Sequence, residues 1–279
     1  MREKLIHLVE QKNDLPPLPE ILRRLEDKID DPDSCLDDIT ELIQTEPVLR
    51  GRLMKLANSV FFCGGREPAT DLGSAIGRLG LKMVLDLAYT LELPNLFVDT
   101  KGFNQLRFWH HSLVVAVCAR SISRLLADKP AEQANAYTAG LMHDIGIMVF
   151  AYLIPDLYAD FLHKCQSVNQ PLEIQEKNEF GIGHPELGAI FIEKWWPIDP
   201  GVVQTVKNHH LPLSEEGSTA VIVANRIANS QGIKNGTNVF VEPEDEALGE
   251  QLGLSAEDTD YVVDEAQEAL NIAQDLLAH

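Results

Sequence analysis

Histidine is concentrated in the middle of this 279-residue chain, and one histidine is followed directly by an aspartate. Six of the nine histidines fall in one segment: His110, His111, His143, His184, His209 and His210. The His143-Asp144 pair lies in an apolar run from Gly140 to Ile147. A carboxylate in such a run is costly to bury unless a cation or strong donors face it. The pair therefore predicts a polar counterpart inside the protein.

These residue types suggest a metal centre. Imidazole and carboxylate suit iron, manganese, zinc and nickel, and ligands on successive helices can surround one ion or bridge two. Such a centre would acidify a bound water and polarise a phosphoryl oxygen, which is the chemistry of phosphoester hydrolysis. The candidate metal ligands are His111, His143, Asp144, His184, His209 and His210.

Simpler roles for these histidines stay open. A single inward histidine is more often a hydrogen-bonded core residue, which we expect for His110 and His163. His143 and Asp144 could form a core pair, and His209-His210 could cap the C-terminal end of a helix. A structural protein with histidines as buried polar struts is therefore one alternative. Convergence of several histidines on an inward aspartate favours a site.

Apolar spacing and helix-end signals predict an all-α protein. Helices are expected at about 2–12, 20–29, 34–43, 47–58, 72–79, 81–91, 105–126, around 140, 184–196, 200–210, 218–230 and after 255. Ser34 with Asp37, and Ser255 with Asp258, resemble capping boxes. His184 is expected to be an N-cap residue that precedes proline.

The apolar stripes also predict which polar groups face inward. His111 falls on the stripe of the helix at 105–126, three residues after Phe108 and four before Val115. The His143-Asp144 pair is expected to lie inside the helix through Gly140, where Asp144 shares a face with Leu141 and Ile147. Both groups should therefore be buried.

Composition and charge limit the function classes. The chain is 45 % hydrophobic and can bury a large core. Its net charge of −20 repels nucleic acids and anionic membrane surfaces, although a local basic cleft could bind a phosphate. The charged start and the lack of a membrane-spanning apolar run predict a cytoplasmic protein. The four dispersed cysteines indicate neither a disulfide framework nor a cysteine-type zinc site.

Three parts are expected along the chain. Residues 1–100 should form an N-terminal helical part, and residues 101–235 a helical part that carries the histidines. Residues 236–279 should form an acidic C-terminal helical segment.

Several short motifs resemble the HDOD family, the HD-related output domain of bacterial signalling proteins. They are Leu15-Pro16-Pro17-Leu18-Pro19, Glu46-Pro47-Val48-Leu49, Leu56-Ala57-Asn58-Ser59 and Ala75-Ile76-Gly77-Arg78-Leu79-Gly80. The resemblance covers about residues 10 to 230 and implies an all-α, HD-type helical domain with an N-terminal helical subdomain. The second half is similar to HD and HD-GYP phosphohydrolases. Their metal ligands would fall on the six candidate ligands named above.

The chain departs from those enzymes at three places. Ile147 stands where HD-GYP enzymes carry lysine, and no Gly-Tyr-Pro motif follows His209-His210. Asn225 stands where those enzymes are expected to carry the aspartate that completes the set of metal ligands. A carboxamide binds transition metals more weakly than a carboxylate does, and it does not offset their charge.

The resemblance and these departures together favour a regulatory module of bacterial signal transduction. Its degenerate HD site would bind a metal or a small, nucleotide-type ligand, and a signalling protein would be its partner. The alternative is a metal-dependent phosphohydrolase acting on a nucleotide or cyclic dinucleotide, with activity that depends on Asp144. The sequence predicts no oligomeric state.

Overall fold

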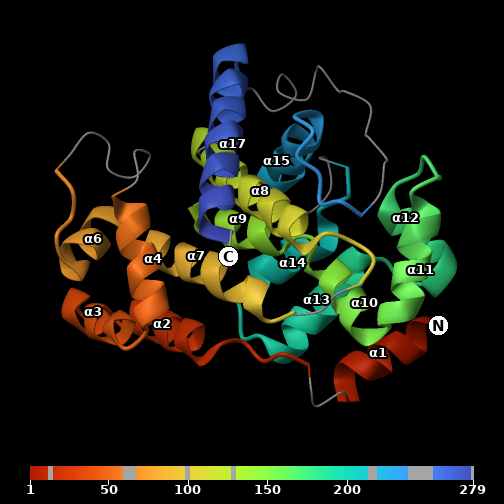
Figure 1. Ribbon diagram of the computed structural model, residues 1–279, viewed down its shortest axis with the longest axis horizontal. Coiled ribbons are helices and arrows are strands. Elements are labelled where there is room, and N and C mark those ends of the chain that lie inside the picture. The colour runs from red at the N-terminus through yellow and green to blue at the C-terminus, as the bar shows by residue number, and fades with distance from the viewer. Residues whose placement is uncertain are drawn as a thin grey trace. The chain divides into compact units, whose positions relative to one another are not determined.

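The computed structural model describes residues 1–11, 15–58, 67–97, 101–126, 130–212, 219–237 and 254–277 (Figure 1). These residues form helices joined by turns and irregular segments, with no strand among them. The all-α prediction is confirmed. The expected loop at 59–65 and most of the acidic connection before Ser255 lie outside the described residues.

Pro17–Leu96 form one compact unit, and Met1–Pro16 together with Phe97–His279 form another. The helices of the first unit are α2 (Glu20–Asp30), α3 (Leu36–Gln44), α4 (Pro47–Ala57), α6 (Leu72–Leu79), α7 (Leu81–Glu92) and the short 3₁₀ helix η1 (Leu93–Asn95). Each α-helix buries an apolar stripe, as in α2, where Ile21, Leu22 and Leu25 face the core. Gly80 has a positive φ of 80° and separates α6 from α7 at the predicted position.

Two predicted helix starts are each wrong by one residue. The capping box at the start of α3 uses Cys35 and Asp38, not Ser34 and Asp37, because the Asp38 carboxylate accepts the Cys35 backbone N–H at 2.8 Å. The helix that contains His184 starts at His184 itself, after Gly183 as the N-cap residue. A carboxylate elsewhere in the chain already accepts the His184 backbone N–H, so no side-chain cap is needed there.

The larger unit is built around one buried helix. Its helices are α1 (Arg2–Gln11), α8 (Gln105–Leu125), α9 (Pro130–Met142), α10 (Ile145–Leu153), α11 (Pro155–Cys165), α12 (Leu172–Phe180), α13 (His184–Trp195), α14 (Pro200–Asn208), α15 (Thr219–Ser230) and α17 (Ala256–Leu277). α8 is buried along most of its length and packs against α9, α15 and α17 (Figure 1). α13 packs between α10 and α14. These contacts bring the histidine-bearing elements together.

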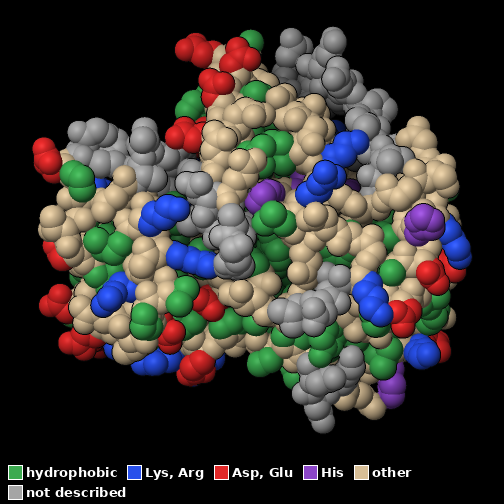
Figure 2. Space-filling model, in the orientation of Figure 1, with side chains coloured by type: hydrophobic (Ala, Val, Ile, Leu, Met, Phe, Trp, Pro, Cys, Tyr) green, Lys and Arg blue, Asp and Glu red, His purple; other side chains and the backbone are tan. Residues whose placement is uncertain are grey.

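The C-terminal helix α17 begins where the sequence predicts. Ser255 and Asp258 form the expected capping box: the Asp258 carboxylate accepts the Ser255 N–H at 2.9 Å, and the Ser255 hydroxyl accepts the Asp258 N–H at 3.1 Å. Acidic side chains gather over α17 on the face shown in Figure 2, and its first turn carries Glu257 and Asp258. Its buried face, which includes Val262, Ala266 and Ala269, packs against α8.

The apolar run that contains the His143-Asp144 pair is not one continuous helix. α9 ends at Met142 and α10 begins at Ile145, so His143 and Asp144 form the turn between them. The prediction that the pair lies inside a helix is therefore wrong. Asp144 has φ −96° and ψ 7°, outside ideal helical geometry. Among the described residues, Gln133–Leu153 is the one stretch long and apolar enough to cross a membrane, and it is 94 % buried, as expected of a core segment.

Close backbone packing holds α10 against the start of α13. A Cβ atom added to Gly146 would lie 2.0 Å from the His184 carbonyl oxygen and 2.9 Å from the Gly188 nitrogen. Both neighbours are backbone atoms and cannot rotate away. This contact places His184 beside the turn that carries Asp144.

Gly146→Ala should therefore destabilise the protein by about 3 kcal/mol or more, at the upper end of the range for overpacked cores. Chemical denaturation measures the change. Gly51→Ala is the control: Gly51 lies in α4 with nothing within 4 Å of its added Cβ, so alanine should stabilise slightly. Unchanged stability in Gly146→Ala would contradict the close contact between α10 and α13.

Candidate metal centre

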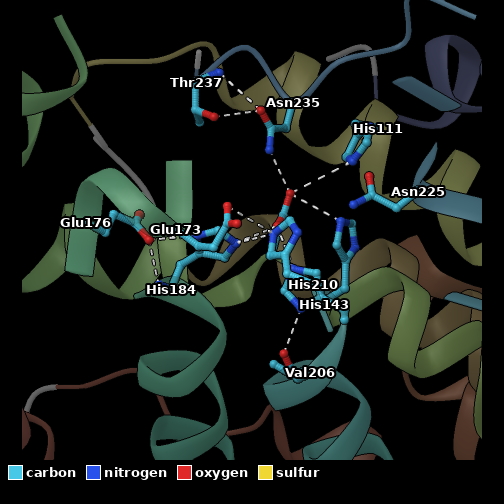
Figure 3. Close-up of polar contacts among 12 residues, drawn as sticks. His111, His143, Glu173, Glu176, His184, Val206, His210, Asn225, Asn235 and Thr237 are labelled. Atoms are coloured by element: carbon cyan, nitrogen blue, oxygen red, sulfur yellow. Dashed lines mark hydrogen bonds and ion pairs between the residues drawn. The ribbon is translucent and has the colours of Figure 1, made fainter. Parts of the chain in front are cut away.

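Asp144 lies at the centre of a buried cluster of histidines supplied by different elements. The histidines are His111 on α8, His143 in the α9–α10 turn, His184 at the start of α13, and His209 and His210 directly after α14. Figure 3 shows how these side chains converge. His111 and Asp144 are 1 % and 3 % exposed, so the predicted inward orientation of both is confirmed. The structure thus brings all six candidate ligands together.

The two carboxylate oxygens of Asp144 each face two imidazoles. Oδ2 lies 3.2 Å from Nε2 of His143 and 3.9 Å from Nε2 of His111. Oδ1 lies 3.3 Å from Nε2 of His184 and 3.5 Å from Nε2 of His209. One carboxylate is therefore shared between two groups of nitrogen atoms.

His210 completes the second group from its outer side. Its Nε2 lies 3.1 Å from Nε2 of His184 and 3.9 Å from the Glu173 carboxylate. The ligand atoms of Asp144, His184, His209 and His210 all lie within 4.8 Å of one another, as do those of His111, His143 and Asp144. Each group is compact enough to surround one ion.

Three of the histidines point their Nε2 atoms towards the centre. Their Nδ1 atoms each contact a backbone carbonyl: His111 that of Ile233 at 2.8 Å, His143 that of Gly140 at 2.7 Å, and His209 that of Val206 at 2.7 Å. A carbonyl only accepts, so Nδ1 carries the hydrogen in all three rings, and a ring that is neutral then has its lone pair on Nε2. These Nε2 atoms are buried and have no hydrogen-bond partner among the described residues. Buried imidazoles fixed in this way fit a metal ion.

Burial and neighbouring charges set the protonation states. Burial lowers the pKa of His111 and of His209 to about 4, so both are neutral near pH 7. Burial also lowers the pKa of His210, helped by the adjacent His209 and His184. Burial would raise the pKa of Asp144, but the surrounding histidines outweigh it and hold the pKa well below its usual range. The centre therefore contains a carboxylate and several neutral imidazoles.

His184 differs because a buried carboxylate, Glu176 on α12, holds it. Oε2 of Glu176 accepts the backbone N–H of His184 at 2.6 Å and its Nδ1–H at 2.7 Å, and Oε1 accepts the Tyr158 hydroxyl at 2.5 Å. Burial alone would lower the pKa of His184, but Glu176 and Asp144 raise it to about 10. Without a metal, His184 is therefore protonated.

Sequence reasoning missed Glu176, although the sequence carried a signal for it. Glu176 lies four residues after Leu172 and four before Phe180, which places it on the inward stripe of α12. A glutamate on such a stripe predicts a buried acceptor. Its position is that of a carboxylate that orients a metal-ligating histidine from behind.

Asn235 is a second residue that sequence reasoning missed. Its Nδ2 donates to Oδ2 of Asp144 at 2.7 Å, and its Oδ1 accepts from the backbone N–H and the hydroxyl of Thr237 at 3.1 and 2.7 Å. Asn235 lies in the irregular segment after α15, where no periodicity indicates which side chains point inward. It orients the carboxylate.

Four further residues discussed above from the sequence are Asn225, Ile147, His110 and His163, none of which is among the six candidate ligands. Asn225 on α15 is 9 % exposed and lies beside His111 (Figure 3). The Ile147 side chain is fully buried in α10, so no cation reaches the centre from that position. His110 is partly buried and its Nε2 has no hydrogen-bond partner among the described residues, and His163 is exposed on α11, so the expectation that both are hydrogen-bonded core residues is wrong. Neither belongs to the two ligand groups.

A small cavity of about 60 Å³ adjoins the centre. Its lining includes Asp144, His184, His210, Asn225, Lys234 and Asn235. A polar cavity of this size holds a few water molecules or a small ion. Exchangeable ligands therefore have room next to the candidate metal ligands.

The histidines give a pH dependence to the stability of the metal-free protein. His184 has a folded pKa of about 10, above its ordinary value of 6.5, so its contribution is complete below pH 6.5 and lost as pH rises towards 10. His111 and His209 have folded pKa values of about 4, so their contributions are lost as pH falls from 6.5 towards 4.

When a chelator has removed any bound metal, the contributions of these three histidines should therefore give the free energy of unfolding a maximum near pH 6.5. Urea denaturation between about pH 4 and pH 10 measures it. Stability that stays level from pH 6.5 to 10 would contradict the protonated state of His184.

Comparison with known proteins places this architecture in a family. A model described as the HDOD domain matches residues 15–212. An uncharacterized protein of Treponema pallidum (strain Nichols) is 27 % identical over 223 residues, which make up 80 % of this chain and 43 % of that protein. The chain thus spans less than half the length of that relative.

Two solved structures are similar over nearly their whole lengths. An HDOD domain protein with unknown function from Geobacter sulfurreducens has a TM-score of 0.79 and 23 % identity, with 99 % of each chain covered. A candidate phosphohydrolase from Shewanella amazonensis SB2B has a TM-score of 0.76 and 21 % identity, with 98 % of this chain and 97 % of that chain covered. At these identities the structures show the fold alone. The family match covers well over half of the sequence, and the chain belongs to the HDOD family.

Proposed function

We propose that this chain is a cytoplasmic module of bacterial signal transduction whose histidine–aspartate centre binds a transition metal and, beside it, a small ligand. The observation that carries the proposal is the set of three buried Nε2 atoms, on His111, His143 and His209, that face Asp144 and have no hydrogen-bond partner among the described residues. Unsatisfied buried polar atoms destabilise a folded protein, and metal bound in the two ligand groups would satisfy them: His111 and His143 belong to one group and His209 to the other.

The residues divide into ligands and groups that orient them. His111, His143, Asp144, His184, His209 and His210 would hold iron, manganese, zinc or nickel. Glu176 fixes the ring of His184, and Asn235 fixes the carboxylate of Asp144. A metal bound here would acidify a water and polarise a phosphoryl oxygen.

Two features favour a regulatory role over turnover. Asn225, an uncharged amide, stands beside His111 where related hydrolases carry a closing aspartate. The buried Ile147 side chain stands where they carry lysine. Both departures remove charge that phosphoester hydrolysis would use, while the histidines that bind metal are kept. A signalling protein that senses the ligand-bound state would be the partner.

Elemental analysis of protein purified without added metal tests the centre. We expect about one equivalent or more of a transition metal per chain, since the two groups share one carboxylate. Less than about a tenth of an equivalent, with no uptake when iron, manganese, zinc or nickel is added, would overturn the proposal.

Phosphoester hydrolysis is the second candidate function, and the cavity beside Asp144, His184 and His210 is what favours it. The assay uses metal-loaded protein and bis(p-nitrophenyl) phosphate, with Asp144→Asn as the inactive reference. We expect wild type to release no more nitrophenol than the reference. Turnover by wild type that is lost in Asp144→Asn would establish the hydrolase instead.

A further inference from the structure

We infer that Lys234 makes the cavity beside Asp144 a binding site for a phosphoryl group. The inference deepens the proposed function and rests on the metal centre proposed above, because the phosphoryl oxygens would contact both the metal and the lysine. It assigns the chemical class of the ligand that the module binds.

The backbone on both sides of Lys234 is fixed to the candidate metal ligands. The carbonyl of Ile233 accepts from Nδ1 of His111 at 2.8 Å, and the side chain of Asn235 donates to Asp144 at 2.7 Å. The Ile233 N–H in turn donates to the Ala228 carbonyl at 2.9 Å, which ties the segment to α15. Lys234 is therefore held beside the centre, and it lines the cavity.

The charge of Lys234 is available to a ligand. Lys234 is partly buried and forms no ion pair or hydrogen bond with any residue that the structure describes. The Glu173 carboxylate lines the same cavity and lies 3.9 Å from Nε2 of His210. Although the protein has a net charge of −20, the Lys234 ammonium group has no acidic partner among the described residues, so it can bind an anionic ligand.

Two further asparagines, Asn225 and Asn229, also line the cavity. They are joined through Nδ2 of Asn229 and Oδ1 of Asn225 at 2.9 Å, and each amide side chain carries an NH₂ donor. A phosphoryl group offers several oxygens at once, so it can bind a metal, an ammonium and an amide together. With about 60 Å³ of space, the cavity accepts a phosphoryl group while the rest of the ligand stays outside.

Lys234 also supplies a positive charge that is missing at position 147, where this chain has isoleucine. Related hydrolases are expected to supply a cation from the helix after the His-Asp pair, and in this chain that position is apolar and buried. Lys234 comes from a different element, the segment after α15, and lines the cavity that adjoins the same aspartate. The site thus keeps a cation from another part of the chain.

The test is binding of inorganic phosphate to the 279-residue chain loaded with Mn²⁺, followed by calorimetry in a phosphate-free buffer. Lys234→Gln removes the charge, and Lys234→Arg keeps it. Lys194→Gln is the matched control, because Lys194 is exposed on α13 and does not line the cavity. Metal content is measured on every sample.

Lys234→Gln should bind phosphate at least about tenfold more weakly than wild type, since a charge-assisted hydrogen bond is lost. Lys234→Arg should stay within about threefold, Lys194→Gln should match wild type, and all should retain Mn²⁺. If the metal is retained and Lys234→Gln binds phosphate as wild type does, or wild type binds none, the phosphoryl site is overturned and the metal centre stands. If wild type takes up no Mn²⁺ or other transition metal, the proposed function fails and the phosphoryl site with it.

Discussion

Replacing Asp144 by asparagine should lower the affinity of the protein for a transition metal by more than about 100-fold. Groups that only orient metal ligands already account for 10–100-fold effects, and Asp144 is placed to be a ligand itself. Each of its oxygens faces two histidine nitrogens, so both ligand groups depend on it. Asparagine keeps the size of the side chain but removes the charge that offsets the cation.

The measurement is a competition titration against a chelator of known affinity, with circular dichroism to show that the helices are retained. Asp160→Asn is the control, because Asp160 is exposed on α11 and makes no contact with the site. It should bind metal as wild type does. Wild-type affinity in Asp144→Asn would remove Asp144 from the centre, and equal loss in Asp160→Asn would point to a general effect of charge.

The inward orientation of the main site residues could be predicted because helix periodicity is strong where they lie. His111 falls between Phe108 and Val115 on the apolar stripe of a long helix, and all three are buried. A period of 3.6 residues fixes the face of every side chain once the helix is known. The spacing of apolar residues therefore predicts that His111 is buried, although it does not predict how far His111 lies from residues on other helices.

The break between α9 and α10 could not be predicted in the same way. No glycine or proline lies between Met142 and Ile145, so the usual signals of a helix end are missing. The turn is formed in the packed protein, where the His143 ring contacts the Gly140 carbonyl and Asp144 meets histidines from other elements. Long-range contacts override local helix preference at this pair.

Asn235 marks the limit of sequence reasoning about the site. Its segment has neither helical nor strand periodicity, and its contact with Asp144 joins residues 91 positions apart. The place of Lys234, the residue before it, could not be predicted from the sequence either, whereas the absence of lysine at position 147 could be recognised. The loss of a charged residue from a motif is visible in one sequence. A lysine from another element can be assigned to the site only when the fold is known.

Replacing Glu176 by glutamine should lower the affinity for a transition metal by about 10- to 100-fold, the range for carboxylates that orient metal-binding histidines. The Glu176 carboxylate accepts three hydrogen bonds, two from His184 and one from the Tyr158 hydroxyl. Glutamine has one acceptor oxygen and an NH₂ group, so it cannot accept all three. The ring of His184 then loses its fixed orientation and part of its basicity.

Competition titration measures this loss, and Glu179→Gln on the exposed face of the same helix is the matched control. A second readout separates an orienting role from a merely structural one. Without Glu176 the pKa of His184 should fall from about 10, although Asp144 still raises it, so the decline in stability between pH 6.5 and 10 should be smaller in the metal-free variant than in wild type. Wild-type metal affinity together with an unchanged pH profile would show that Glu176 does not act through His184. Loss of affinity with an unchanged profile would assign the effect to packing around Tyr158, because only the contact with His184 links Glu176 to both measurements.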